Sequence, residues 1–106
     1  MGVKHMEHKG FKKVEQPEQV KMEKPGESVR GKFLAIEESA KYAESYAVTF
    51  RGKGEKLQVV FVNKMARDLF ARAKVKNGQE FILEFLETRT SEKDMVYNVY
   101  ELHVAD

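Results

Sequence analysis

The pattern of apolar and polar positions divides the chain at about residue 28. Residues 1–27 are polar, contain both prolines and show no sustained period of 2 or 3.6, so we expect a partly flexible arm there. Within this arm only 20–24 could pair as an edge strand, with Val20 and Met22 on one side. From Ser28 onward, β-branched and aromatic residues come in runs separated by turn formers, which predicts one strand-rich domain over 28–106.

Five strands are predicted in this domain. The first run has Gly31 in its interior, where a glycine usually marks a bulge or a sharp bend. The second run is followed by Gly52 and Gly54, which favours a hairpin to the third run. Both faces of that third run are apolar, which indicates a central position in the sheet. The strands are expected over 28–37, 45–51, 56–62, 80–89 and 95–104.

A helix is predicted between the third and fourth strands, because the apolar period changes there. Met65, Leu69 and Ala73 lie four residues apart, and the intervening Ala66 and Phe70 widen the same stripe. Asn63 is suited to cap the N-terminus, and Gly78 is suited to the left-handed conformation that ends a helix. The remaining side chains of this segment are mostly charged and form its outer face.

The order strand, strand, strand, helix, strand, strand is typical of the five-stranded Greek-key barrel called the OB-fold. A curled sheet with the helix plugging one end buries the apolar faces and removes exposed edges, so we expect a mainly β fold of this kind. Two alternatives stay open. One is a five-stranded SH3-like barrel, which usually lacks a three-turn helix at this point, and the other is an open α+β sheet.

Composition narrows the function classes. The chain has 106 residues, which is the usual size of one domain, and no cysteine, so disulfides and thiolate metal sites are excluded. No apolar run approaches the roughly 20 residues that span a bilayer, and we expect neither membrane insertion nor a secretory signal. These observations together favour a cytoplasmic protein.

Charge is segregated along the chain although the net charge is only +2. Residues 51–76 carry eight basic side chains against two acidic ones, a sum of +6, whereas 77–106 carry two against seven, a sum of −5. A polyanion could therefore bind one face, while the molecule as a whole is not of the strongly basic type.

Motifs for catalysis and for cofactors are weak. Gly26 to Lys32 fits the first seven places of a phosphate-binding loop, but the eighth is Phe33 rather than Ser or Thr, and a strand-like run follows instead of a helix. His5 and His8 lie in the arm, where nothing fixes a metal geometry, and His103 is the only other imidazole. No nucleophile, metalloprotease or kinase motif is present. We expect a protein that is not an enzyme and needs no metal or cofactor.

A binding surface for single-stranded nucleic acid is the remaining hypothesis. Such surfaces combine basic side chains that follow the phosphates with aromatic rings on which bases stack. Candidate rings are Tyr42, Tyr46 and Tyr97, although Tyr46 shares a face with Val48 and Phe50, which favours a place in the core. Phenylalanines 33, 61, 70, 81 and 85 are interpreted as interior. The candidate cations on the first strand and around the turn after the second are Arg30, Lys32, Arg51, Lys53 and Lys56.

Glycine placement and strand texture in segments 11–17, 25–37, 45–48 and 60–63 carry a resemblance to a known family. The chain resembles the small OB-fold single-stranded DNA-binding proteins of bacteriophages and related mobile elements. The resemblance implies coating of single-stranded DNA in replication or recombination, by residues that correspond here to Lys32, Tyr42, Tyr46, Arg51, Lys53, Lys56 and Tyr97. The chain has no tryptophan and does not end in an acidic tail, so recruitment of repair enzymes through such a tail is not implied.

The leading expectation is therefore low-specificity binding of single-stranded DNA, with RNA as a second possible ligand. The alternative is an OB-fold subunit that binds other proteins in a replication, transcription or viral assembly, with the basic helix face meeting an acidic partner. Fold alone does not decide between them. A homo-oligomer is compatible with either function.

Overall fold

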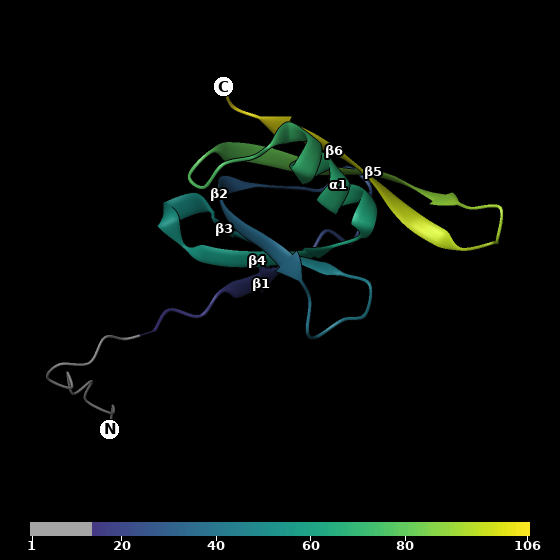
Figure 1. Cartoon of the computed structure of the whole chain (residues 1–106), viewed down its shortest axis with the longest axis horizontal. Helices are drawn as coiled ribbons and strands as arrows, with labels where there is room; N and C mark the ends of the chain where they lie inside the picture. The colour runs from purple at the N-terminus through teal and green to yellow at the C-terminus, as the bar shows by residue number, and fades with distance from the viewer. Residues whose placement is uncertain (1–13) are drawn as a thin grey trace, which may run out of the picture.

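The computed structural model describes residues 14–106, which form one β-sheet with a single α-helix (Figure 1). The expected mainly β fold, with a helix between the third and fourth strands after residue 28, is confirmed. The elements are β1 (Glu18–Val20), β2 (Ser28–Glu38), β3 (Tyr46–Arg51), the short 3-10 helix η1 (Lys53–Glu55), β4 (Leu57–Val62), α1 (Lys64–Ala73), β5 (Glu80–Thr90) and β6 (Val96–Val104). None of the helices over 14–106 has both the length and the apolar character needed to cross a membrane.

The sheet is open, and the expected closure into a five-stranded barrel is not found. Its six strands follow the order β1-β4-β3-β2-β5-β6, so β1 and β6 are its two edges. The physical reason lies in the segment that we predicted as an arm. Residues 18–20 pair in parallel with residues 58–60, and thereby occupy the β4 edge that a closing strand would need. The edge strand considered over 20–24 lies at 18–20 instead, while Val20 and Met22 both pack against the core, as their shared side predicted.

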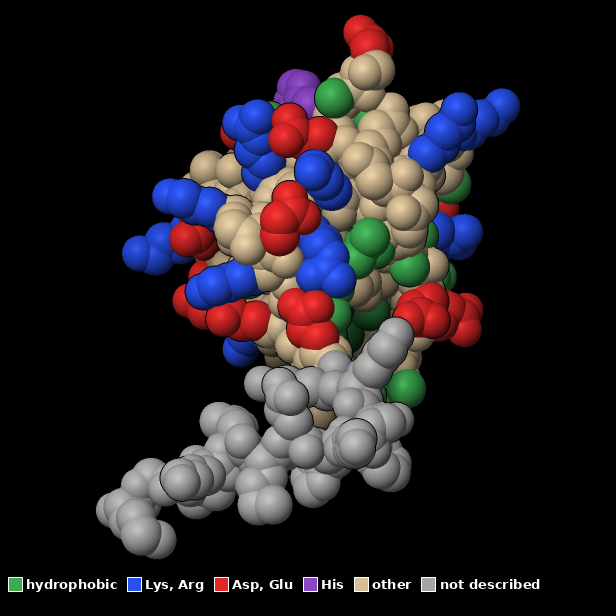
Figure 2. Space-filling model, turned by 90° about the vertical axis from the view of Figure 1, so that its left-hand side faces the viewer, with side chains coloured by type: hydrophobic (Ala, Val, Ile, Leu, Met, Phe, Trp, Pro, Cys, Tyr) green, Lys and Arg blue, Asp and Glu red, His purple; other side chains and the backbone are tan. Residues whose placement is uncertain are grey.

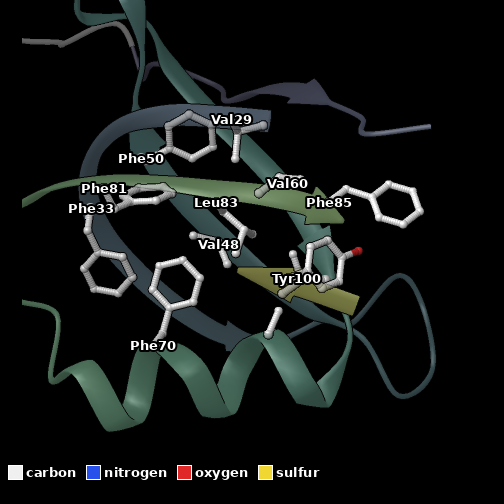
Figure 3. Packing of buried hydrophobic residues seen from close by; sticks show 12 residues of the cluster. Val29, Phe33, Val48, Phe50, Val60, Phe70, Phe81, Leu83, Phe85 and Tyr100 are labelled. Carbon is white, nitrogen blue, oxygen red and sulfur yellow. The ribbon is translucent and has the colours of Figure 1, made fainter. Parts of the chain in front are cut away.

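Strand β2 curves through the sheet and pairs differently along its length (Figure 3). Residues 28–32 pair with β5, and residues 32–38 pair with β3, with a register shift between Phe33 and Ala35. The bulge is therefore displaced from Gly31, where we expected it. Gly31 is required for another reason, because a Cβ atom there would collide with the Arg51 carbonyl oxygen and the Phe50 ring.

The core lies between the inner face of the sheet and α1 (Figure 3). Phe81 is at its centre, with ring centroids 5.4 Å from Phe50, 5.3 Å from Phe70 and 6.4 Å from Phe33, all in edge-to-face geometry. Phe70 and Ala66 are the buried residues of α1, so the helix contributes one narrow apolar stripe. The predicted stripe is thus confirmed at its centre.

Asn63 connects the helix to the far edge of the sheet. Its Oδ1 accepts a hydrogen bond from the Ala66 backbone N–H at 3.0 Å, which is the predicted N-cap. Its Nδ2 donates to the Asn98 carbonyl at 2.9 Å. This side-chain bond links the end of β4 to the beginning of β6, although the two strands are not paired in the sheet. The helix ends earlier than predicted, with Lys74 rather than Gly78 in the left-handed conformation next to its last residue.

Replacing Asn63 by alanine should lower the free energy of unfolding by about 1 to 3 kcal/mol, because the cap and the bond to Asn98 are both lost. Urea unfolding followed by circular dichroism measures this. Asn63→Asp is the matched variant, since it keeps the capping oxygen but loses the donor, and it should lie between the wild type and Asn63→Ala. Equal losses for the two variants would show that the cap contributes nothing.

Candidate nucleic-acid interface

The outer face of β3 and β4 forms the candidate interface. Strand alternation turns Val48, Phe50, Val60 and Val62 into the core and leaves the other residues of both strands outside. In register across the two strands, Ala47 faces Phe61, Thr49 faces Val59 and Arg51 faces Leu57. All six are half-buried rather than fully solvated. We call this set the outer strip: Ala47, Thr49, Arg51, Leu57, Val59 and Phe61.

An aromatic pair marks one end of the outer strip. The Tyr42 ring, from the β2–β3 loop, meets Phe61 edge-to-face at 4.9 Å between centroids and remains 40% exposed. The Ser39 hydroxyl accepts hydrogen bonds from the backbone N–H groups of Lys41 and Tyr42 and thereby fixes the loop. The Lys41 ammonium lies 5.2 Å from the Tyr42 centroid, and it lowers the pKa of the Tyr42 hydroxyl, with Gln19 as the next cause.

A guanidinium marks the other end. Arg51 Nη1 lies 3.0 Å from Glu15 Oε1 and also donates to the Glu55 carbonyl at 3.0 Å. The second oxygen of Glu15 accepts from the Leu57 backbone N–H at 3.3 Å. The hydrogen bond from Arg51 is the main reason that the pKa of Glu15 lies below its usual value. Arg51 thereby favours the ionised form of Glu15.

The predicted cations gather near this end, but carboxylates accompany most of them. Arg30 pairs with Glu80 at 3.2 Å and Lys32 pairs with Glu55 at 3.2 Å, in addition to the Arg51 pair. Figure 2 shows blue and red side chains interspersed over one face of the molecule. Within residues 14–106, Lys53 and Lys56 make no ion pair. The local positive potential is therefore weaker than the five predicted cations would give by themselves.

The other two predicted tyrosines lie elsewhere. Tyr46 is half-buried on the inner face with Val48 and Phe50, and the Arg67 guanidinium sits 5.1 Å from its ring centroid. Alternation along β3 puts it opposite to the outer strip. Tyr97 is 39% exposed on the edge strand β6, paired in register with Arg89 on the β5–β6 hairpin. Of the three candidate rings, the structure brings only Tyr42 to the outer strip.

Phe61 is the functional candidate that the sequence interpretation assigned to the interior, and this was wrong. It is half-buried on the outer face, where it supports the Tyr42 ring. The signal that could have placed it is the alternation of 57–62, in which Phe61 shares a face with Leu57 and Val59, whereas Gln58 shares a face with Val60 and Val62. Both faces are apolar, so the alternation left the choice ambiguous.

The structure also locates the phosphate-loop-like segment and one of the three histidines considered as metal ligands. The phosphate-loop-like segment runs into β2, so no helix follows it. His5 and His8 lie outside the described residues. His103 lies with Glu84 and Glu101, and their potential ligand atoms are all within 4.8 Å of one another. These three side chains are spaced so that they could hold a divalent cation.

No protein-family model matches this sequence, and neither a curated protein nor a solved structure matches it.

Proposed function

We propose that this protein is an OB-fold-like module that binds single-stranded DNA along the outer strip, with little sequence preference. The strand order supports the fold assignment. Strands β5-β2-β3-β4 are neighbours in that order, which is the 4-1-2-3 arrangement of a Greek key when the strands after residue 28 are counted. A helix between β4 and β5 agrees with the element order of an OB-fold. The resemblance to the single-stranded DNA-binding proteins of bacteriophages is part of the same proposal.

The observation that carries the proposal is the exposed Tyr42 ring supported by Phe61, with the Lys41 ammonium over one side of the ring. A base can stack on such a ring whatever its identity, while Lys41 contacts the adjoining phosphate. From Ala47 to Arg51 the strip covers four residue steps, which is about 13 Å at the rise of a strand. A short run of unpaired nucleotides could therefore reach from the ring to the guanidinium.

Glu15 occupies the position where a phosphate would bind. A guanidinium and a backbone N–H are the donors that commonly hold phosphate oxygens, and both are directed here at one carboxylate. A nucleic acid that uses Arg51 must displace this carboxylate. Glu15 thus acts as an internal competitor for the cationic end of the strip.

Glu15→Gln should raise the affinity for a thymidine oligonucleotide several-fold, because a neutral amide competes less strongly for Arg51 than a carboxylate does. Fluorescence anisotropy of a labelled oligonucleotide at low salt measures the change. Glu18→Gln is the matched control, since Glu18 accepts a hydrogen bond from Gln58, whereas the polar partners of Arg51 within residues 14–106 are Glu15 and the Glu55 carbonyl. If Glu15→Gln bound no more tightly than this control, Glu15 would not be a competitor.

The salt dependence of binding tests the proposed function itself. Affinity for oligothymidine should fall steeply between 50 and 200 mM salt, with log K decreasing by about 0.7 per phosphate contacted for each decade of salt. Substituting Arg51 and Lys53 together by glutamine should flatten this slope. An absence of binding at low salt would reject the proposal.

A protein-binding function is the second candidate, and the pairing of Arg30, Lys32 and Arg51 with carboxylates favours it, since paired cations attract phosphates less. In that case the protein would bind a partner without any salt-dependent affinity for oligothymidine. The salt titration distinguishes the two candidates.

A further inference from the structure

The tip of the β5–β6 hairpin presents an apolar knob to solvent. Met95 is 63% and Val96 is 70% exposed, and these are high values for large apolar side chains. The turn beneath them is closed, because Ser91 and Met95 are joined by a backbone hydrogen bond of 2.9 Å from Ser91 N–H to the Met95 carbonyl. Figure 1 shows this hairpin extending away from the rest of the molecule. We define the knob as Met95 and Val96.

Acidic side chains flank the knob. Glu92 and Asp94 belong to the turn itself, and Lys93 between them is the only base in the segment 90–96. The knob therefore has an apolar centre and a net negative rim. A surface that accepts it must offer an apolar depression with basic walls.

Such a depression lies elsewhere on the same protein, between β2 and α1. This groove has a volume of about 380 Å³, and Phe33, Ile36, Phe70 and Val75 contribute apolar side chains to it. Arg67 and Lys74 supply positive charge at its lining. Arg67 is paired with Asp68, with 3.3 Å between Nε and Oδ1, whereas Lys74 makes no ion pair within residues 14–106. The unbalanced positive charge of the groove is therefore that of Lys74.

We propose that the knob of one copy of this chain docks into the groove of a second copy. The apolar centre of the knob matches the groove lining, and Glu92 or Asp94 of the incoming hairpin would face Lys74. The other occupant that the chain itself offers is its segment 1–13, which carries four lysines and one glutamate. That segment has the same sign of charge as the groove wall, so charge complementarity favours the hairpin.

Knob and groove are different surfaces, and the association is therefore head-to-tail. An interface of this type does not close on itself at two copies and adds copies in a chain or ring. The average mass in solution should rise with protein concentration and should fall when salt screens the rim charges. This inference does not involve the outer strip, so it stands or fails independently of nucleic-acid binding.

A mixing experiment tests the proposal. Met95→Asp damages only the knob, and Ala71→Glu damages only the groove, which Ala71 lines as an exposed residue of α1. By sedimentation velocity each variant alone should be a monomer, whereas an equimolar mixture should form a dimer that grows no further, because one intact knob then meets one intact groove. Ala73→Glu, on the same helix but outside the groove, is the control and should assemble like the wild type.

Three results would overturn the proposal. The wild type could stay monomeric up to about 1 mM, which means a Kd weaker than that concentration; the variants could each assemble like the wild type; or the mixture of the two variants could stay monomeric. Symmetric pairing of two hairpins would show itself as an Ala71→Glu variant that dimerises alone. If deletion of 1–13 alone created assembly, the groove would be occupied by that segment instead. Circular dichroism verifies folding of each variant. Met95→Ser replaces Met95→Asp if the aspartate variant is unfolded.

Discussion

Phe81→Ala should lower the free energy of unfolding by about 3 to 5 kcal/mol, which is a large part of the stability of a domain of this size. The ring is 1% exposed and meets Phe33, Phe50 and Phe70 edge-to-face. These partners come from β2, β3 and α1, so the cavity left by alanine would lie where the helix meets both halves of the sheet. Partial collapse cannot fill it without moving several elements.

Urea unfolding at 25 °C, followed by circular dichroism, measures the loss for Phe81→Ala. Tyr97→Ala is the control, because Tyr97 is an exposed aromatic residue on an edge strand and its removal should change stability by about 1 kcal/mol or less. Similar effects for the two variants would mean that the core is not organised around Phe81.

Tyr42→Ala should weaken binding of oligothymidine by about 5- to 150-fold, the equivalent of roughly 1 to 3 kcal/mol for one base stacked on an aromatic ring. The salt slope should stay unchanged, because the ring carries no charge that a phosphate contacts. Tyr42→Phe should bind nearly as well as the wild type, since it retains the stacking surface over Phe61.

Tyr42→Leu separates stacking from packing. Leucine still covers Phe61 but offers no aromatic face, so its affinity should be close to that of Tyr42→Ala. Anisotropy titrations of the three variants under one salt condition provide the comparison. Wild-type affinity in Tyr42→Leu would show that the ring supports the loop only and does not stack on a base.

Local signals predicted most of the fold. Asn63 caps the helix, the glycine-containing segment after β3 turns the chain into β4, and the apolar alternation of 46–51 places Val48 and Phe50 in the core. Local signals could not predict that the sheet stays open. The open edge results from the pairing of 18–20 with 58–60, two segments that are separated by forty residues. Pro17 and the polar neighbours of Val20 give the first of these segments little strand character.

The candidate site was predictable only in part for a similar reason. Loop position and the absence of apolar neighbours placed Tyr42 outside the core, and the structure has it exposed. The state of Arg51 could not be inferred, because its partner Glu15 lies 36 residues earlier in a polar segment without periodicity. Phe61 was wrongly predicted to be interior. Both faces of β4 carry apolar residues, so the sequence does not indicate which face points to the core.

Chemical-shift mapping tests most directly whether nucleic acid binds along the outer strip. A ¹⁵N-labelled sample is titrated with a short oligothymidine at low salt, and the backbone amide signals are followed. We expect the largest changes at Lys41, Tyr42, Thr49 and Phe61, with the hairpin tip at Met95 unaffected. Changes confined to α1 or to β6, or no changes at all, would contradict the binding of nucleic acid along the outer strip.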